Sequence, residues 1–367
     1  MRILMIAENY LPTIGGVTRH VSGLSQELVR RGHEVQVFCL NKSEPKKLRR
    51  EKIAGVSVLR LPAESKCFQQ ELNRQAYLYS QVEVIQVHDF GNCVRFIFPF
   101  CMQMPNLPLF MTFHGYEGQL PVAANIRRLR QACWGLALGT VNIGTLIEQW
   151  YGTPADLILS GGIETTQLAP PTEPPNNYEF VFIGRLEADN PLFLYLETLG
   201  RLREKGVPAT LTLCGPGALK DQLIEAADAL KVPLRVLDPT YETMPLRAQA
   251  RFILGGGWLS ILEGLASHRV VFSAGHTTAT RAALRAHPAV DRCFPAAENS
   301  EELLDKIMSV VANPQLEMGL TKRGYEFAGT CTWENVCTQY LDLWTSKLDN
   351  PQRNTKVCCI KQDNTAG

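Results

Sequence analysis

Short apolar runs alternate with amphipathic stretches along most of the chain, and this order constrains the fold more than any other feature. Near the N-terminus, the apolar runs 2–7 and 34–40 flank an amphipathic stretch that is closed by Gly32 after two arginines. A strand, a helix and a second strand in this order form a right-handed crossover between parallel strands. The first half of the chain is therefore predicted to be a Rossmann-like α/β domain.

A second series of the same kind begins at about residue 178 and follows a polar stretch, 167–179, that contains four prolines. Such a stretch has little to pack and is typical of a linker, so we expect a domain boundary near residue 170. We predict an N-terminal domain over 1–168, a C-terminal domain over 177–330, a helix that crosses back over 331–348 and a disordered tail over 349–367.

Length, charge and cysteine content narrow the class of protein. The 367 residues suffice for two domains, and 37 basic against 36 acidic side chains create no overall field for nucleic acid or anionic lipid. Eleven cysteines without C-x-x-C spacing favour reduced thiols in a cytoplasmic protein over a disulfide framework or a zinc site. Glu8 interrupts the first apolar run, which favours a strand over a signal peptide.

The stretch 42–52 is the one basic cluster, and it contains Lys46, Lys47, Arg49 and Arg50. One interpretation is a solvated loop or helix face. The other is a patch that contacts anionic lipid at the inner membrane face or an acidic acceptor.

Ligands of doubly wound domains bind at the carboxyl ends of the strands, so the loops that follow the strands are the informative ones. In the first of these loops, Gly15 and Gly16 stand where a helix begins. Paired glycines at a helix N-terminus allow amide groups to approach an anion. The loop lacks the G-x-G-x-x-G pattern and no acidic residue follows the second strand, which disfavours an NAD-dependent oxidoreductase.

The run 9–40 resembles the opening of the retaining nucleotide-sugar glycosyltransferases of family 4. Further motifs follow in the family's order, so that the resemblance covers roughly residues 1 to 345; they are VIQVHDF, MTFHGYEG, LILSGGIETTQLAP, FVFIGRL, LTLCGPGAL and LSILEGLASHRVVFSAG. The resemblance implies a GT-B fold, in which two Rossmann-like doubly wound domains face a central cleft. It also implies an acceptor-binding N-terminal domain, a donor-binding C-terminal domain, and transfer with retention that requires no metal or cofactor.

The same resemblance assigns roles to the residues at the predicted strand ends. Gly16, with Gly15, matches the loop that faces the donor diphosphate. His114 matches the histidine near the reacting sugar, and a capped histidine at the end of a strand is the alternative. Arg185 ends an apolar run, and its guanidinium fork suits phosphate, although a merely solvated arginine is the alternative. Glu263 lies in an apolar stretch where a carboxylate needs a partner, and it matches the family's ribose ligand.

Three further residues are expected on the acceptor side. His88 and Asp89 follow another apolar run, and Tyr10 lies in the first loop. For the first two, packing beneath the cleft is an equal alternative.

Two positions depart from the family pattern. Asn190 stands where a lysine is expected, and Gly255 stands where the first of two glutamates is expected. Gly255 and Gly256 indicate either a close backbone approach or a site that has lost its side chains. Lys220, Arg247 or a backbone nest are candidate replacements for the missing contacts.

We therefore expect a hexosyltransferase that uses a nucleotide-sugar, with a UDP-sugar favoured, and a hydroxyl acceptor in glycan, glycolipid or natural-product assembly. The alternative is a catalytically silent or donor-altered GT-B protein that binds a ligand or partners an active transferase. A GT-B phosphorylase or epimerase also remains open. The expected mechanism is attack on the same face of the sugar while Arg185 and the glycine amides stabilise the departing phosphate.

Overall fold

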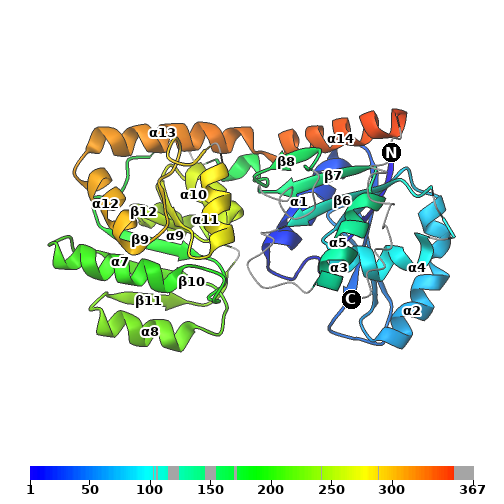
Figure 1. Ribbon diagram of the computed structural model, residues 1–367, viewed down its shortest axis with the longest axis horizontal. Helices are drawn as coiled ribbons and strands as arrows, with labels where there is room; N and C mark the ends of the chain where they lie inside the picture. The colour runs from blue at the N-terminus through cyan, green and yellow to red at the C-terminus, as the bar shows by residue number, and fades with distance from the viewer. Residues whose placement is uncertain are drawn as a thin grey trace, which may run out of the picture.

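The computed structural model describes residues 1–101, 103–104, 106–114, 124–144, 154–168, 172–240, 242–287 and 289–350. Two α/β domains lie side by side, each with helices packed around its own sheet (Figure 1). The predicted class, two Rossmann-like domains, is confirmed.

The N-terminal sheet has eight strands in the order β3-β4-β2-β1-β5-β6-β7-β8. All neighbours in it are parallel except β3 and β4. The central strands are buried along nearly their whole length, as parallel strands covered on both faces must be. The strand bounds are β1 Arg2–Ile6, β2 Glu34–Asn41, β3 Arg49–Ile53, β4 Val56–Pro62, β5 Val84–His88, β6 Leu109–His114, β7 Gly139–Ile143 and β8 Leu157–Leu159.

Helix α1, Gly16–Arg30, belongs to the N-terminal domain and contacts the C-terminal domain through Arg19. Its apolar face buries Val21, Leu24 and Leu28. Gly32 ends it in the left-handed region, with φ of 83°, and the next amide reaches back to the carbonyl of Leu28 at 3.0 Å. The other helical elements of this domain are α2 Ser65–Arg74, η1 Ala76–Ser80, α3 Phe90–Asn92, η2 Cys93–Ile97, α4 Phe98–Cys101 and α5 Ala124–Leu136.

The C-terminal sheet has six strands, all parallel, in the order β11-β10-β9-β12-β13-β14. Phe180, Phe252 and Phe272 pack against one another from three neighbouring strands and form the centre of its core. The strand bounds are β9 Glu179–Ile183, β10 Thr210–Cys214, β11 Leu234–Leu237, β12 Phe252–Gly255, β13 Val270–Ala274 and β14 Ala296–Ala297. The helices are η3 Thr165–Gln167, α7 Leu192–Glu204, α8 Lys220–Ala229, α9 Met244–Gln249, α10 Trp258–Ala266, α11 Thr278–Ala286, α12 Ser300–Val311 and α13 Pro314–Thr330.

Helix α14, Trp333–Asp349, continues from the C-terminal domain onto the N-terminal one (Figure 1). Its apolar residues Val336, Tyr340 and Trp344 belong to the same core as strand β1 and helix α1. The ring of Trp333 lies where a Cβ on Gly23 would stand, so only glycine fits at that point of α1. The last helix is thus part of the N-terminal core.

A buried chain of hydrogen bonds also ties α14 to the first sheet. The indole Nε1 of Trp344 donates to Gln86 Oε1 at 3.1 Å, and Gln86 Nε2 donates to Thr112 Oγ1 at 3.0 Å. Thr112 Oγ1 in turn bonds to the hydroxyl of Tyr340 at 2.8 Å. These contacts fix the helix over strands β5 and β6.

Within the part of the chain that the structure describes, none of the helices is long and apolar enough to cross a membrane. Cys39, Cys133, Cys214, Cys293 and Cys337 are buried free thiols. The predicted tail falls outside the described residues from position 351 onward.

Candidate functional site between the two domains

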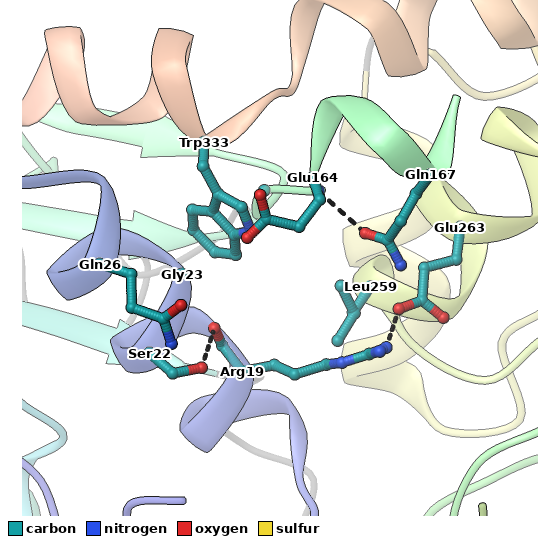
Figure 2. A pocket seen from close by; sticks show the side chains of 10 residues that line it. Arg19, Ser22, Gly23, Gln26, Glu164, Gln167, Leu259, Glu263 and Trp333 are labelled. Carbon is teal, nitrogen blue, oxygen red and sulfur yellow. Dashed lines mark hydrogen bonds and ion pairs between the residues drawn. The ribbon is translucent and has the colours of Figure 1, made fainter. Parts of the chain in front are cut away.

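A cavity of about 110 Å³ lies between the two domains (Figure 2). Helix α1 contributes one wall, and the segment before η3, helix α10 and the start of α14 contribute the others. The lining residues are Arg19, Ser22, Gly23, Gln26, Gly162, Glu164, Gln167, Leu259, Glu263 and Trp333. Parts of both domains therefore meet at one small polar space.

Glu263 is held by two arginines, one from each domain. Arg247 Nη1 bonds to its Oε2 at 2.9 Å, and Arg19 Nη1 pairs with its Oε1. Glu263 and Arg247 are almost fully buried, at 4% and 2% exposure. Ser267 completes the cluster, because its hydroxyl accepts from Arg247 Nε at 3.1 Å and donates to the Glu263 carbonyl at 2.7 Å. Both carboxylate oxygens are thus engaged within the protein.

Arg247, one of the predicted replacement cations, is committed to this cluster. Burial lowers the pKa of its guanidinium, and the charge of Glu263 opposes that effect. A cation so enclosed cannot turn toward a ligand without leaving Glu263. The other candidate, Lys220, is exposed at the first position of α8.

The glycine loop stands at the start of α1, as predicted. Gly15 is the N-cap, and its carbonyl accepts from the amide of Arg19 at 2.9 Å. Gly16 is exposed, and a Cβ added there would meet nothing within 4 Å. The positive end of a fifteen-residue helix is therefore open beside Arg19.

His114 and His88 end the neighbouring strands β6 and β5, and His20 of α1 joins them. The Nδ1 of His88 bonds to the Nε2 of His114 at 2.9 Å, and the rings of His20 and His114 meet edge to face at 4.8 Å. His20 Nε2 bonds to the hydroxyl of Tyr340 at 3.0 Å. The sequence reading missed His20, since its spacing indicated only the buried face of a helix.

All three imidazoles are neutral at pH 7. Burial lowers the pKa of His20 to about 3. Burial, reinforced by the neighbouring histidines, also holds the pKa values of His88 and His114 well below the ordinary value. The Nε2 of His88 is buried and has no hydrogen-bond partner within the described structure. The cluster can therefore accept hydrogen bonds without adding positive charge.

Asp89 braces the end of β6. Its backbone has a φ of 67°, and its Oδ1 accepts from the amide of His114 at 2.9 Å. Burial raises the pKa of this carboxyl to about 7, although the bond from His114 opposes the shift. Through this hydrogen bond, the Asp89 carboxyl fixes the backbone that carries His114.

Tyr10 does not line the cleft, which corrects the sequence-based expectation. Its side chain is 0% exposed, and its hydroxyl bonds to Ser25 Oγ of α1 at 2.9 Å. The ring belongs to the apolar core between α1 and the first sheet. A tyrosine in that position anchors the loop rather than contacting an acceptor.

Arg185 follows β9 and points to solvent, with its side chain 62% exposed. Its guanidinium pairs with Asp189 four residues later. Asn190 stands where the resemblance leads us to expect a lysine. Its Nδ2 donates to the carbonyl of Arg185 at 2.9 Å, so this side chain holds the loop.

The glycines at the end of β12 and just after it are explained by close packing. A Cβ on Gly255 would stand 2.6 Å from Cγ1 of Ile261, and one on Gly256 would stand 2.5 Å from Oδ1 of Asn190. The amides of Gly256 and Gly257 both donate to Ser260 Oγ, at 3.0 and 3.1 Å. Of the two interpretations of these glycines, the structure favours a close backbone approach, and the amides of the predicted nest are already occupied.

Several cations of the basic cluster contact acidic side chains of the protein. The cluster is predicted as a loop or helix face, but Arg49 and Arg50 belong to β3, the antiparallel edge strand of the first sheet. Lys46 pairs with Glu64, Lys47 with Glu44 and Arg49 with Glu51, whereas Arg50 donates to the neutral amide oxygen of Gln75. Glu51 is also shared with Arg60, so part of the positive charge stays uncompensated.

Among the residues that the structure describes, no group of three or more His, Cys, Asp or Glu side chains is arranged to hold a metal ion. The three imidazoles above pack by edges and faces and do not converge on one point.

Residues 14–143 match the model of Glycosyltransferase Family 4. No curated protein matches the chain by sequence. Among solved structures, sucrose-phosphate synthase from Thermosynechococcus elongatus superposes with a TM-score of 0.75 at 12% identity, over 94% of this chain and 98% of that one.

Two further structures agree along their whole length. Anabaena HepE in complex with UDP and glucose has a TM-score of 0.71 at 12% identity, over 94% of this chain and 100% of HepE. The catalytic domain of Arabidopsis thaliana starch synthase IV, bound to ADP and acarbose, has a TM-score of 0.68 at 13% identity, over 95% of this chain and 99% of that domain. Residues 14–143 therefore resemble Glycosyltransferase Family 4, and the chain shares the two-domain GT-B fold of the solved structures on which it superposes.

Proposed function

We propose that the protein is a retaining glycosyltransferase that moves a hexose from a nucleotide-sugar to a hydroxyl acceptor. The observation that carries the proposal is the position of α1. Its first turns join the two halves of the site, because Arg19 contacts Glu263 while the adjacent His20 contacts His114. The open amide end at Gly16 lies in the same turns.

The donor half of the site suits a nucleoside diphosphate. Arg185 stands at the end of β9, and Asn190, which holds its loop, contacts Gly256 immediately before α10, the helix that carries Glu263. An exposed guanidinium and open helix amides are both anion ligands. HepE was solved with UDP and starch synthase IV with ADP, which supports a nucleoside diphosphate as the leaving group; we favour UDP.

The proposed chemistry is attack by the acceptor hydroxyl on the face that the phosphate leaves, with the hydroxyl proton passing to the departing phosphate oxygen. As the bond to the phosphate breaks, Arg185 and the amides at Gly15 and Gly16 stabilise its growing negative charge. Neutral His114, fixed through its amide by Asp89, positions the reacting centre. The carboxylates described in the site are bonded to protein groups, which supports direct attack over a glycosyl-enzyme intermediate.

A second candidate is a donor-altered or catalytically silent GT-B protein that binds a ligand or partners an active transferase. The observation that favours it is the saturation of Glu263, whose two oxygens are both occupied by arginines. A ribose that binds that carboxylate competes with Arg19 for its outer oxygen. Asn190 also supplies no charge where the family pattern has a lysine.

Ligand binding and turnover distinguish the two. Thermal unfolding with UDP, GDP, ADP and CMP, and with their sugar conjugates, should show a rise in Tm for one diphosphate and for its sugar conjugate. Transfer to a hydroxyl acceptor with that conjugate should then keep the anomeric configuration. Binding of the diphosphate without turnover of any conjugate would favour the second candidate, and no binding at all would overturn the proposal.

Arg185→Ala tests the proposed phosphate ligand. Loss of one charge-assisted contact should weaken diphosphate binding about tenfold or more. Asp189→Ala is the matched control, since it removes the partner of Arg185 and leaves the guanidinium in place. Full diphosphate affinity in the Arg185→Ala protein would exclude this role.

A further inference from the structure

The charges around Glu263 do not balance. Arg247 alone neutralises the carboxylate and is buried against it. Arg19 is a second cation on the same carboxylate, and its side chain is 34% exposed at the cavity (Figure 2). The two guanidinium groups repel each other, and the charge of Arg19 adds to the lowering of the Arg247 pKa. Two cations therefore share one carboxylate, and the outer one is on a side chain that lines the cavity.

A hydroxyl ligand of the outer Glu263 oxygen competes with Arg19 for that oxygen. A neutral ligand that displaces the guanidinium offers it no anion in place of Glu263, which costs a charge-assisted hydrogen bond. A ligand that also carries a phosphate gives that guanidinium a new partner. The phosphate would lie toward the start of α1, where Gly16 opens the helix amides three residues before Arg19.

We propose that Arg19 exchanges between Glu263 and a donor phosphate, and that this exchange makes the site reject neutral nucleosides and accept nucleoside diphosphates. The inference rests on the proposed function and deepens it. Asn190 stands where a lysine is expected and cannot serve as a second cation for the phosphate. The proposal gives that role to Arg19 of helix α1.

The other cations of the site are less suited to this exchange. Arg247 is enclosed and also bonded to Ser267. Arg185 already pairs with Asp189 on its own loop. Arg19 is the arginine that lines the cavity itself and whose present partner is the predicted ribose ligand.

Calorimetry with matched pairs of ligands tests the exchange. Uridine and UDP, adenosine and ADP, guanosine and GDP, and cytidine and CDP would be titrated into the wild-type, Arg19→Ala and Arg19→Lys proteins. The quantity of interest is the ratio of nucleoside Kd to diphosphate Kd for the base that binds. Arg19→Ala should lower this ratio about ten- to a hundredfold, because the nucleoside gains affinity and the diphosphate loses it.

Arg30→Ala is the matched control. Arg30 lies on the same helix and forms ion pairs with Glu27 at 3.1 Å and with Glu164 at 3.3 Å, but does not line the cavity. Its removal should leave the ratio unchanged, while Arg19→Lys should retain part of it. Thermal unfolding of each ligand-free variant checks that the proteins are folded.

The outcomes separate this inference from the proposed function. If diphosphates bind and the ratio is the same in the wild-type and Arg19→Ala proteins, the exchange is wrong and the transferase proposal stands. If the diphosphate gains affinity in Arg19→Ala as much as the nucleoside does, Arg19 only blocks the site and the exchange is again wrong. If no nucleotide binds any of these proteins, both proposals fail.

Discussion

The two sides of the site have opposite electrostatic character. On the N-terminal side, His20, His88 and His114 are kept neutral by burial and are braced by α14. On the C-terminal side, Arg185 and Glu263 are charged, and each already has a partner within the protein. Neutral groups in a packed environment are positioned before a ligand arrives. Charged groups that satisfy each other must change partners when it binds, so we expect selectivity to depend on the charged groups, Arg19 of α1 included.

Glu263→Ala should have the largest effect on stability. It leaves the Arg247 charge buried without its partner, which costs about 3 to 5 kcal/mol of unfolding free energy. Urea denaturation measures the loss. The double variant Glu263→Leu with Arg247→Met removes both charges and should recover most of it. A loss below about 1 kcal/mol in Glu263→Ala would show that water reaches Arg247 readily.

Acid should destabilise the N-terminal side. An unfolded histidine gains a proton below its ordinary pKa of 6.5, whereas folded His20 stays neutral down to about 3. The unfolded state then binds more protons, so stability falls as pH drops between these values. At pH 5, His20 alone should cost about 2 kcal/mol relative to neutral pH. Urea denaturation at pH 7 and pH 5 measures the change.

Asp89 should oppose the loss of stability in acid, and its substitution is the control for the histidine prediction. Its pKa is raised to about 7, so its folded form gains the proton first as pH falls, and acid stabilises this group. Asp89→Asn removes that contribution and should steepen the loss of stability between pH 7 and pH 5. A wild-type protein that is more stable at pH 5 would mean that the carboxyl outweighs the imidazoles.

Restoring the family's glutamate should not repair the C-terminal side. In Gly255→Glu, the new Cβ would stand 2.6 Å from Ile261, and such overpacking costs about 1 to 3 kcal/mol. Transfer activity should not rise. The control is Gly329→Ala in α13, where an added Cβ meets nothing within 4 Å and stability should hold. Higher activity in Gly255→Glu would instead indicate a lost catalytic side chain.

Arg185→Ala should have the smallest effect on stability. The side chain is 62% exposed, and exposed ion pairs contribute less than about 1 kcal/mol. The free energy of unfolding should therefore change little, even though nucleotide binding weakens. A loss of several kcal/mol would mean that the pair with Asp189 holds the loop, and the charged side would then be as rigid as the neutral one.

Much of the fold could be predicted because apolar runs must be buried. The strands that end at His88 and His114, and the one that precedes Arg185, follow from that requirement alone. The strands β3 and β4 were not foreseen, since an edge strand such as β3 needs little burial and its charges resemble a loop.

The pairing across the site could not be predicted. Arg19 and Glu263 are 244 residues apart, and the spacing of Arg19 within α1 indicates only a helix position. The same limit applies to His20, whose partner Tyr340 lies 320 residues away. Sequence pattern locates a side chain on its own element, whereas its partner is decided by how distant elements pack.

The position of α14 has a consequence for how the protein is made. The apolar interior of the N-terminal domain includes Val336, Tyr340 and Trp344. During synthesis this domain emerges first, yet its interior stays incomplete until the final helix has left the ribosome. The half of the molecule that is translated first is therefore the half that finishes folding last. A chain that stops before residue 333 would leave apolar core surface of this domain exposed, where chaperones could bind.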